Sequence, residues 1–395
     1  MRFLSAFCAI MVAMVFAGPQ TKSFCQSKAA PTGDQYRQYD FAAAGHSTPY
    51  RLYVPSRYDG ARLYPLIVVL HGGGRDENTD FDTTDLRKLA EERSVIVVSP
   101  LGCNRFGAYG NIYPVVFSAA AAAETIRIQP TSSKLDCQAA VAPSGTPGSQ
   151  SHSVPASASD YVEVPAGFIT DPHVSALSEQ DVMNVVALVR KEYRVDPARV
   201  YLLGNSMGGI GTLYLAAKYP EVWAAIAPAG GPIAVWSYPF ERLRDFHVAV
   251  RLVHGELDEH ANPHWSQVLF ERAREVGVEA DLAVVPGGDH SHAWAMALPQ
   301  TFDWLLRHQK PAMTGENASQ SINAPASVPT FPPLGSQRSV RSPEAGADGH
   351  IAFRVYAPAA NTVVGEGGIE TQAHLATIGG GQHDVGAAQA GGLRR

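Results

Sequence analysis

The sequence has no concentration of positive charge and no set of residues with the spacing of metal ligands. Its 31 Lys and Arg residues are scattered and its formal net charge is -6, which argues against nucleic acid or an anionic membrane as a partner. No cluster of His, Cys and Asp has ligand spacing, so we expect neither a metal nor a cofactor. The partner that remains is a small or neutral polymeric substrate.

The N-terminus also has no apolar run long enough to span a bilayer. Arg2 precedes an apolar stretch at residues 3 to 16, which ends at the small residues Ala17 and Gly18. Because about 20 apolar residues are needed to cross a membrane, this pattern predicts a cleaved export signal at residues 1 to 17 rather than an anchor. We therefore expect a secreted or periplasmic protein, without stable membrane insertion after cleavage. A polar leader, residues 18 to 45, follows.

Cysteine is scarce, with four residues in 395. Cleavage of the signal would remove Cys8. In an oxidising compartment Cys103 and Cys137 could then form a disulfide within one inserted region, and Cys25 would remain near the new N-terminus.

Apolar runs and helical patterns alternate through the middle of the chain. The 45% hydrophobic content supports a sizeable core, and the length allows one domain of about 250 residues with extensions, or two domains. Strands are predicted at residues 50 to 55, 64 to 70, 94 to 99, 200 to 203, 222 to 229, 248 to 254 and 280 to 285. Helices are predicted at residues 83 to 93, from a Ser178 cap completed by Asp181, from 262 to 277, and from 293 to 307 with an interruption at Pro299. This alternation predicts an α/β fold with a mainly parallel central sheet and helices on both faces.

The stretch RVYLLGNSMGGIG, residues 199 to 211, joins a strand directly to a helix through Ser206. A serine in such a tight turn holds its hydroxyl clear of the backbone, and the crowded turn tolerates only small residues two positions away, here Gly204 and Gly208. The N-terminal N–H groups of the following helix point at the same place, where an oxyanion can be stabilised. The pattern predicts a nucleophile elbow.

A second glycine-rich loop follows the strand at residues 64 to 70. It reads His71-Gly72-Gly73-Gly74. Glycines at the carboxyl end of a central strand let backbone N–H groups approach a ligand closely, and this is where a second oxyanion donor is expected.

The regular alternation fails between residues 102 and 172. This segment is rich in Ala, Ser, Pro and Gly and carries aromatic residues that include Phe106 and Tyr109. Because it leaves the carboxyl end of a strand, where open α/β sheets bind their ligands, we interpret it as a partial lid or a substrate-shaping insertion.

A serine nucleophile needs a base, and the base needs a carboxylate, both at the carboxyl ends of later strands. The acid is expected in HGELDEH. Asp258 is favoured over Glu256 and Glu259, because a short carboxylate a few residues past the strand reaches the rim of the sheet.

The base is expected in PGGDHSHAW, after the last strand. His290 lies in the glycine-rich turn and is favoured, whereas His292 is expected to enter a helix behind a Ser291 cap. Other histidines, such as His254 and His260, are expected at the surface or in support of the site.

Four blocks together resemble a known family. They are YPLIVVLHGGG, DPARVYLLGNSMGG, VRLVHGELDEH and VPGGDHSHAW. Over about residues 46 to 310 the chain resembles secreted α/β-hydrolases of the esterase group that includes feruloyl and acetylxylan esterases and polyhydroxybutyrate-depolymerase-like enzymes. The resemblance implies Ser206 as nucleophile, Asp258 as acid, His290 as base, and the N–H groups of Met207 and of Gly73 or Gly74 as the oxyanion hole. Asn205 stands where histidine is commoner in the family.

The end of the chain, residues 311 to 395, changes to Pro, Ser, Ala and Gly and predicts a linker. Within it SPEAGADGHIAFRVYAPAANTV resembles the opening of an immunoglobulin-like early-set module, with one strand expected at residues 348 to 357. The sequence after it lacks strand alternation and core residues, so we expect a truncated or frame-shifted module with a disordered end.

These features predict a serine carboxylic-ester hydrolase that acts on small acyl esters or on polysaccharide-linked acyl or feruloyl esters. Two alternatives remain open. A secreted serine peptidase of the prolyl-oligopeptidase type would need an N-terminal propeller, for which we expect no room. A binding protein on an inactive hydrolase scaffold would need a broken triad, whereas every part is present in the sequence.

Overall fold

The computed structural model describes residues 30–111, 113–118, 161–164, 171–231, 233 and 238–311, together with the backbone of four strands nearer the C-terminus. The chain divides into two units, Met1–Ala326 and Ser327–Arg395. The predicted signal at residues 1 to 17 and most of the predicted insertion lie outside the described residues. Among the residues described, no helix is both long and apolar enough to cross a membrane.

The first unit alternates strands and helices as the sequence predicts. Its strands are β1 Gly33–Phe41, β2 His46–Val54, β3 Tyr64–Leu70, β4 Ile96–Pro100, β5 Val115–Ser118, β6 Tyr161–Val164, β7 Val195–Asn205, β8 Ala225–Ala229, β9 Ala249–Gly255 and β10 Ala280–Val285. Its helices are η1 Ala42–Ala44, α1 Thr79–Thr83, α2 Leu86–Arg93, η2 Ala108–Gly110, α4 Pro172–Glu192, α5 Met207–Lys218, α6 Phe240–Asp245, α7 Pro263–Glu275 and α8 His292–Leu305.

Eight of these strands form one sheet in the order β1-β2-β4-β3-β7-β8-β9-β10. β1 and β2 pair antiparallel to their neighbours, and all pairs from β4 to β10 are parallel. This is the α/β-hydrolase fold, and it confirms the predicted fold class. The continuous apolar run of β3 is buried at all seven positions, as expected for a parallel strand covered on both faces.

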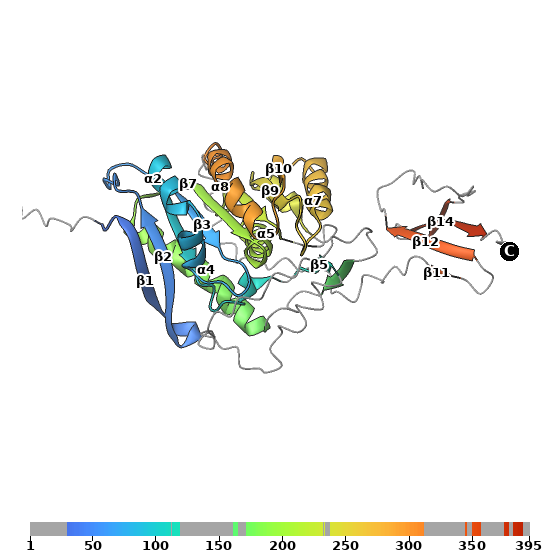
Figure 1. Ribbon diagram of the computed structural model, residues 1–395, viewed down its shortest axis with the longest axis horizontal. Helices are drawn as coiled ribbons and strands as arrows, with labels where there is room; N and C mark the ends of the chain where they lie inside the picture. The colour runs from blue at the N-terminus through green and yellow to red at the C-terminus, as the bar shows by residue number, and fades with distance from the viewer. Residues whose placement is uncertain are drawn as a thin grey trace, which may run out of the picture. The chain divides into compact units, whose positions relative to one another are not determined.

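Helices cover both faces of the sheet. α2 and α8 pack on one face, where Leu89 and Phe302 join Val69 and Leu203 of the strands in one core cluster. α4 and α5 pack against the strands from the opposite face, as Figure 1 shows. Because both faces are covered, a ligand can reach the central strands only at their ends, and open α/β sheets bind ligands at the carboxyl ends.

The structure adds a strand to the segment predicted as a leader. β1 pairs antiparallel with β2 along nine residues, from Gly33 to Phe41. Its half-buried face carries the polar Gln35 and Arg37 before Tyr39 and Phe41, and Arg37 pairs with Glu192 of α4 at 2.6 Å. The strand was missed because an edge strand that binds a helix through polar groups lacks the apolar alternation on which the prediction depends.

Three predicted helices differ in detail. α4 begins at Pro172 with Asp171 as its N-cap, whereas the predicted cap, Ser178, lies buried inside the helix. The helix predicted at residues 83 to 93 is divided by Thr84, which is extended at φ -132° and ψ 174°. α8 continues through Pro299, because its buried apolar face holds the helix on the core on both sides of the proline.

The start of the predicted insertion is fixed to α4. Asp181 accepts a hydrogen bond from the N–H of Gly102 at 2.7 Å, and Ser178 accepts one from the N–H of Tyr109 at 3.1 Å. Further on, β5 and β6 form a two-stranded antiparallel ladder. The first residues after β4 therefore have a defined position beside the carboxyl edge of the sheet.

The second unit contains a four-stranded antiparallel sheet in the order β11-β12-β14-β13. Its strands are β11 Glu344–Ala345, β12 His350–Tyr356, β13 Leu375–Ile378 and β14 Gln382–Gln389. The sequence predicts β12 alone. The other three strands left no signal because backbone hydrogen bonds can form a ladder without alternating apolar side chains. β13 and β14 lie within the end of the chain for which disorder is predicted, and the predicted identity of the module stays a prediction.

Candidate active site

Ser206 occupies a strained turn between β7 and α5. Its backbone lies at φ 57° and ψ -118°, in a region that residues other than glycine rarely adopt and that costs about 1–3 kcal/mol. The turn is held on both sides, because the Ser206 N–H donates to the carbonyl of Ala229 at 2.8 Å and the Ile210 N–H donates to the carbonyl of Ser206 at 3.0 Å. The hydroxyl is thus presented at the carboxyl edge of the sheet.

The two glycines that flank the serine are required by close backbone contacts. A Cβ atom on Gly204 would lie 2.6 Å from the carbonyl oxygen of Gly208, and one on Gly208 would overlap the carbonyl oxygen of Leu70. In both cases the added carbon would lie closer to the oxygen than any normal carbon–oxygen contact. The prediction that only small residues fit two positions before and after Ser206 is confirmed.

The structure brings three of the predicted residues together from distant parts of the chain. Nε2 of His290, in the turn after β10, lies 2.9 Å from the Oγ atom of Ser206. Nδ1 of the same ring lies 2.8 Å from Oδ2 of Asp258, in the turn after β9. A hydroxyl, an imidazole and a carboxylate joined in this order are the arrangement that activates a serine nucleophile.

The alternative base lies elsewhere. The side chain of His292 is 78% exposed, and its Nδ1 contacts Asp289 at 2.7 Å. Asp289 also accepts the N–H groups of Ser291 and His292, so this aspartate caps α8 and Ser291 does not. Of the alternative acids, Glu256 accepts the N–H of Gly287 at 2.8 Å and so points toward a neighbouring turn.

Asp258 is the most enclosed member of the group, at 2% exposure. Its Oδ1 accepts the backbone N–H groups of His260 and Ala261, each at 2.8 Å. Burial alone would raise the pKa of the Asp258 carboxyl, but attraction to His290 and hydrogen bonds from His254 and His290 hold this pKa well below its usual range. Asp258 is therefore a carboxylate at any pH near neutrality.

The glycine loop after β3 lies against the elbow. A Cβ atom on Gly72 would be 3.6 Å from Cβ of Ser206, and one on Gly73 would be 3.9 Å from Cβ of Met207. The N–H of Gly74 donates to the carbonyl of Arg105 at 2.9 Å. Since that donor is engaged, Gly73 is the member of the predicted pair that can share an oxyanion with Met207.

Two rings to which the sequence analysis gave only a general role stand beside the site. Phe106 would be 3.4 Å from a Cβ atom on Gly74 and 3.9 Å from one on Gly73, so its ring covers the glycine loop. His260 meets the ring of His290 edge-on, with centroids 4.7 Å apart, and its side chain is 49% exposed. Phe106 falls six residues after β4, and an aromatic residue near the end of a central strand was the available signal.

Gly230 is a further residue that the sequence did not assign. Its φ is 51°, and a Cβ atom there would lie 3.4 Å from Asp258 Oδ2 and from His290 Nδ1. A methyl group would thus be in ordinary contact with the pair, and the positive φ is what favours glycine here. Among the described residues, no group of three or more His, Cys, Asp or Glu is arranged to hold a metal ion.

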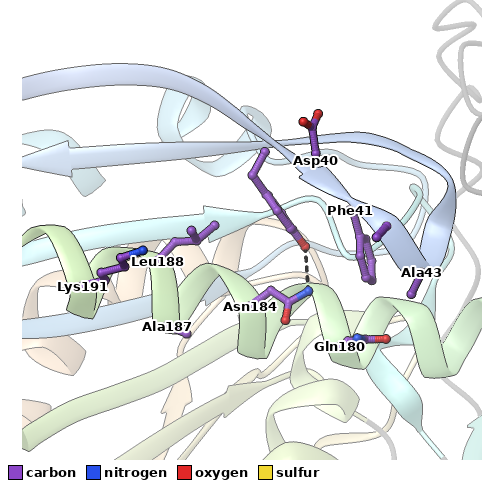
Figure 2. A pocket seen from close by; sticks show the side chains of 10 residues that line it. Asp40, Phe41, Ala43, Gln180, Asn184, Ala187, Leu188 and Lys191 are labelled. Atoms are coloured by element: carbon purple, nitrogen blue, oxygen red, sulfur yellow. Dashed lines mark hydrogen bonds between the residues drawn. The ribbon is translucent and has the colours of Figure 1, made fainter.

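A separate hollow of about 400 Å³ lies between the end of β1 and α4 (Figure 2). The hydroxyl of Tyr39 accepts from Nδ2 of Asn184 at 3.2 Å there and donates to Asp181 at 2.7 Å. The hollow is lined by Tyr39, Asp40, Phe41, Ala42, Ala43, Gln180, Asn184, Ala187, Leu188 and Lys191. None of these residues belongs to the group around Ser206, so the hollow is distinct from the candidate active site.

Part of the chain matches a known protein family. Residues 179–305 match the family model described as Putative esterase. This segment runs from α4 to the end of α8 and contains Ser206, Asp258 and His290.

Individual proteins match shorter segments. Poly(3-hydroxyalkanoate) depolymerase C of Paucimonas lemoignei is 42% identical over 67 residues, 17% of this chain and 16% of that protein. The bifunctional acetylxylan esterase/xylanase XynS20E of Neocallimastix patriciarum is 35% identical over 83 residues, 21% of this chain and 12% of that protein. The chain thus spans less than a fifth of the length of these relatives. Among solved structures, a thermostable esterase is similar at a TM-score of 0.46 and 20% identity, over 70% of this chain and 63% of the other.

Proposed function

We propose that the protein is a serine carboxylic-ester hydrolase, with Ser206 as nucleophile, His290 as general base and Asp258 as the orienting acid. The observation that carries the proposal is the continuous contact from Ser206 Oγ through His290 to Asp258, at 2.9 and 2.8 Å. The strained elbow that presents the serine supports the same reading.

The first half-reaction forms an acyl-enzyme. Ser206 Oγ attacks the ester carbonyl carbon while His290 Nε2 takes the hydroxyl proton, and Asp258 stabilises the imidazolium that results. The negative oxygen of the tetrahedral intermediate accepts the N–H groups of Met207 and Gly73. Its collapse breaks the bond to the alcohol oxygen, which leaves with the proton returned by His290.

The second half-reaction regenerates the enzyme. His290 takes a proton from water, the resulting hydroxide equivalent attacks the acyl carbon, and collapse releases the carboxylic acid with Ser206 protonated again. Loss of one oxyanion donor is expected to lower kcat by about 100- to 1000-fold.

For the substrate we propose acyl or feruloyl esters linked to polysaccharide, together with small acyl esters. Support comes from the local similarity to an acetylxylan esterase and to a polyester depolymerase. The ring of Phe106 over the glycine loop provides an apolar surface for an acyl group or for an aromatic acid.

A fluorophosphonate probe tests the catalytic serine directly. The wild-type protein should form one covalent adduct at Ser206, and Ser206→Ala should form none. Aryl acetate, feruloyl ester, acetylxylan and peptide substrates then separate the reaction classes. Labelling with peptide cleavage alone would indicate the peptidase alternative, and absence of both labelling and turnover would indicate a binding protein.

We also propose that the protein is exported. Cys103 is disulfide-bonded, and stable disulfides form mainly in oxidising compartments. Its partner lies outside the described residues, which leaves the predicted partner, Cys137, to be tested. Peptide mapping of the unreduced protein identifies the bonded pair.

Sequencing the N-terminus of material recovered outside the cytoplasm should find the first residue after the cleaved signal, and a retained Met1 would contradict export through that signal.

A further inference from the structure

A second imidazole contacts the carboxylate of Asp258. His254, near the end of β9, places Nε2 3.0 Å from Oδ2 of Asp258. The same oxygen contacts Nδ1 of His290 at 2.8 Å. The side chains of His254 and Asp258 are each 1% exposed, so water does not compete for the contact between them.

The surroundings of His254 fix which nitrogen carries the proton. Nε2 faces two acceptors, Asp258 Oδ2 and, at 3.0 Å, the carbonyl oxygen of Ala261. An imidazole nitrogen between two acceptors must carry a hydrogen. Nδ1 lies 2.5 Å from the hydroxyl of Ser266 on α7, which can donate to it. A hydrogen on Nε2, shared between its two acceptors, therefore satisfies both of these contacts, and the Ser266 hydroxyl completes the third.

With this donor in place, every acceptor position of Asp258 is used. Oδ1 accepts two backbone N–H groups, from His260 and Ala261. Oδ2 accepts from His290 and from the Nε2 hydrogen of His254, which is shared with the Ala261 carbonyl. A carboxylate has about four acceptor positions. Without His254 a buried lone pair would lose its donor, and Oδ2 would be held only by the ring that it has to orient.

We propose that His254 is a positioning residue for catalysis, an inference that rests on the proposed serine hydrolase function. Held from α7 through Ser266, it fixes Oδ2 of Asp258 in the direction of His290. The carboxylate then keeps the imidazole of His290 in the tautomer and orientation that can accept the proton of Ser206. His254 touches no reacting atom and acts through Asp258.

Two substitutions separate positioning from simple stability. His254→Leu removes the donor, whereas His254→Gln keeps an N–H group on a side chain of similar length. We expect His254→Leu to lower kcat by about ten- to a hundredfold with KM changed less than about twofold, and His254→Gln to recover most of the loss. Fluorophosphonate labelling carried to completion counts the reactive serines, so that kcat is expressed per competent site.

A proton spectrum reports the geometry without any turnover. The hydrogen-bonded Nδ1 proton of His290 should resonate far downfield in the wild type, and it is assigned by its loss in His290→Gln. In His254→Leu this signal should shift or broaden, and His254→Gln should restore it. Ser266→Ala, which removes the hydroxyl behind His254, serves as a milder variant and should lower kcat severalfold.

An unchanged kcat and an unchanged downfield proton in His254→Leu would overturn the proposal. Equal losses in the Leu and Gln variants would also overturn it, because they would indicate a need for the ring as packing alone. If wild-type protein neither hydrolyses esters nor takes the probe, the proposed function fails. The downfield proton would still show whether His254 positions the pair.

Discussion

The backbone N–H of Gly74 donates to the carbonyl oxygen of Arg105 over 2.9 Å. The Arg105 guanidinium in turn pairs with Asp76 at 3.0 Å. The end of the glycine loop, at Gly74, and Asp76 just after it are thus both tied to the chain that follows β4. The proposed donor, Gly73, sits between this tie and the elbow, so the tie determines where its N–H group lies.

Arg105→Ala should therefore weaken catalysis more than binding. The backbone bond remains, but the ion pair that holds Arg105 against the loop is lost. We expect kcat to fall by about three- to tenfold with little change in KM, because a looser oxyanion donor mainly affects the transition state. Steady-state kinetics with an aryl acetate measure this. Arg93→Ala, which removes a surface pair with Asp303, is the matched control and should keep full activity.

The strain at Ser206 should be visible as a stability difference between two inactive variants. Ser206→Ala and Ser206→Gly should both lower kcat by at least about a thousandfold. Glycine adopts φ 57° without the cost that alanine retains, so Ser206→Gly should unfold at the higher urea concentration. We expect a difference of about 1 kcal/mol after the greater flexibility of unfolded glycine is included. Equal midpoints would show that the elbow is not strained.

Two glycines of the site should respond differently to alanine. Gly208→Ala places a methyl group on the carbonyl of Leu70, which should cost more than about 3 kcal/mol or prevent folding. Gly73→Ala places a methyl group 3.9 Å from Met207, an ordinary van der Waals contact. It should leave the free energy of unfolding within about 1 kcal/mol of the wild-type value. Urea denaturation followed by circular dichroism measures both. Similar losses in the two variants would contradict the packing described for the elbow.

Asp80 should make the protein less stable as pH rises. It lies in α1 at 3% exposure, its Oδ2 has no hydrogen-bond partner among the described residues, and burial raises its pKa to about 6 against the opposing charge of Arg75. The folded carboxyl binds its proton more tightly than the unfolded one, whose pKa is near 3.9. Stability from this group is therefore lost between about pH 4 and pH 6 and stays lost above.

Asp80→Asn removes this ionisation. Its free energy of unfolding relative to wild type should be higher at pH 7 than at pH 4 by on the order of 2 kcal/mol. Urea titrations of both proteins at the two pH values provide the measurement. A difference that is the same at both pH values would show that folding does not raise the pKa of Asp80.

Local patterns were sufficient for much of the fold. β3 and β10 have the predicted bounds, and α7 begins after Asn262, whose side chain accepts the N–H of His264. Buried parallel strands and capped helices are recognisable because their signals lie within a few residues of one another. β1 was missed because it is ordered by its contacts with β2 and α4, and not by a pattern within its own residues.

The sequence by itself determined that a serine elbow, a later acid and a final histidine follow one another at strand ends, because each of these signals is local. The tertiary structure decided which groups meet. It placed His290, and not His292, within reach of Ser206. It engaged the N–H of Gly74 in a hydrogen bond, so that Gly73 is the candidate oxyanion donor. It also set His254 against Asp258. These choices depend on distances between residues far apart in the chain, and such distances are fixed only when the sheet has assembled.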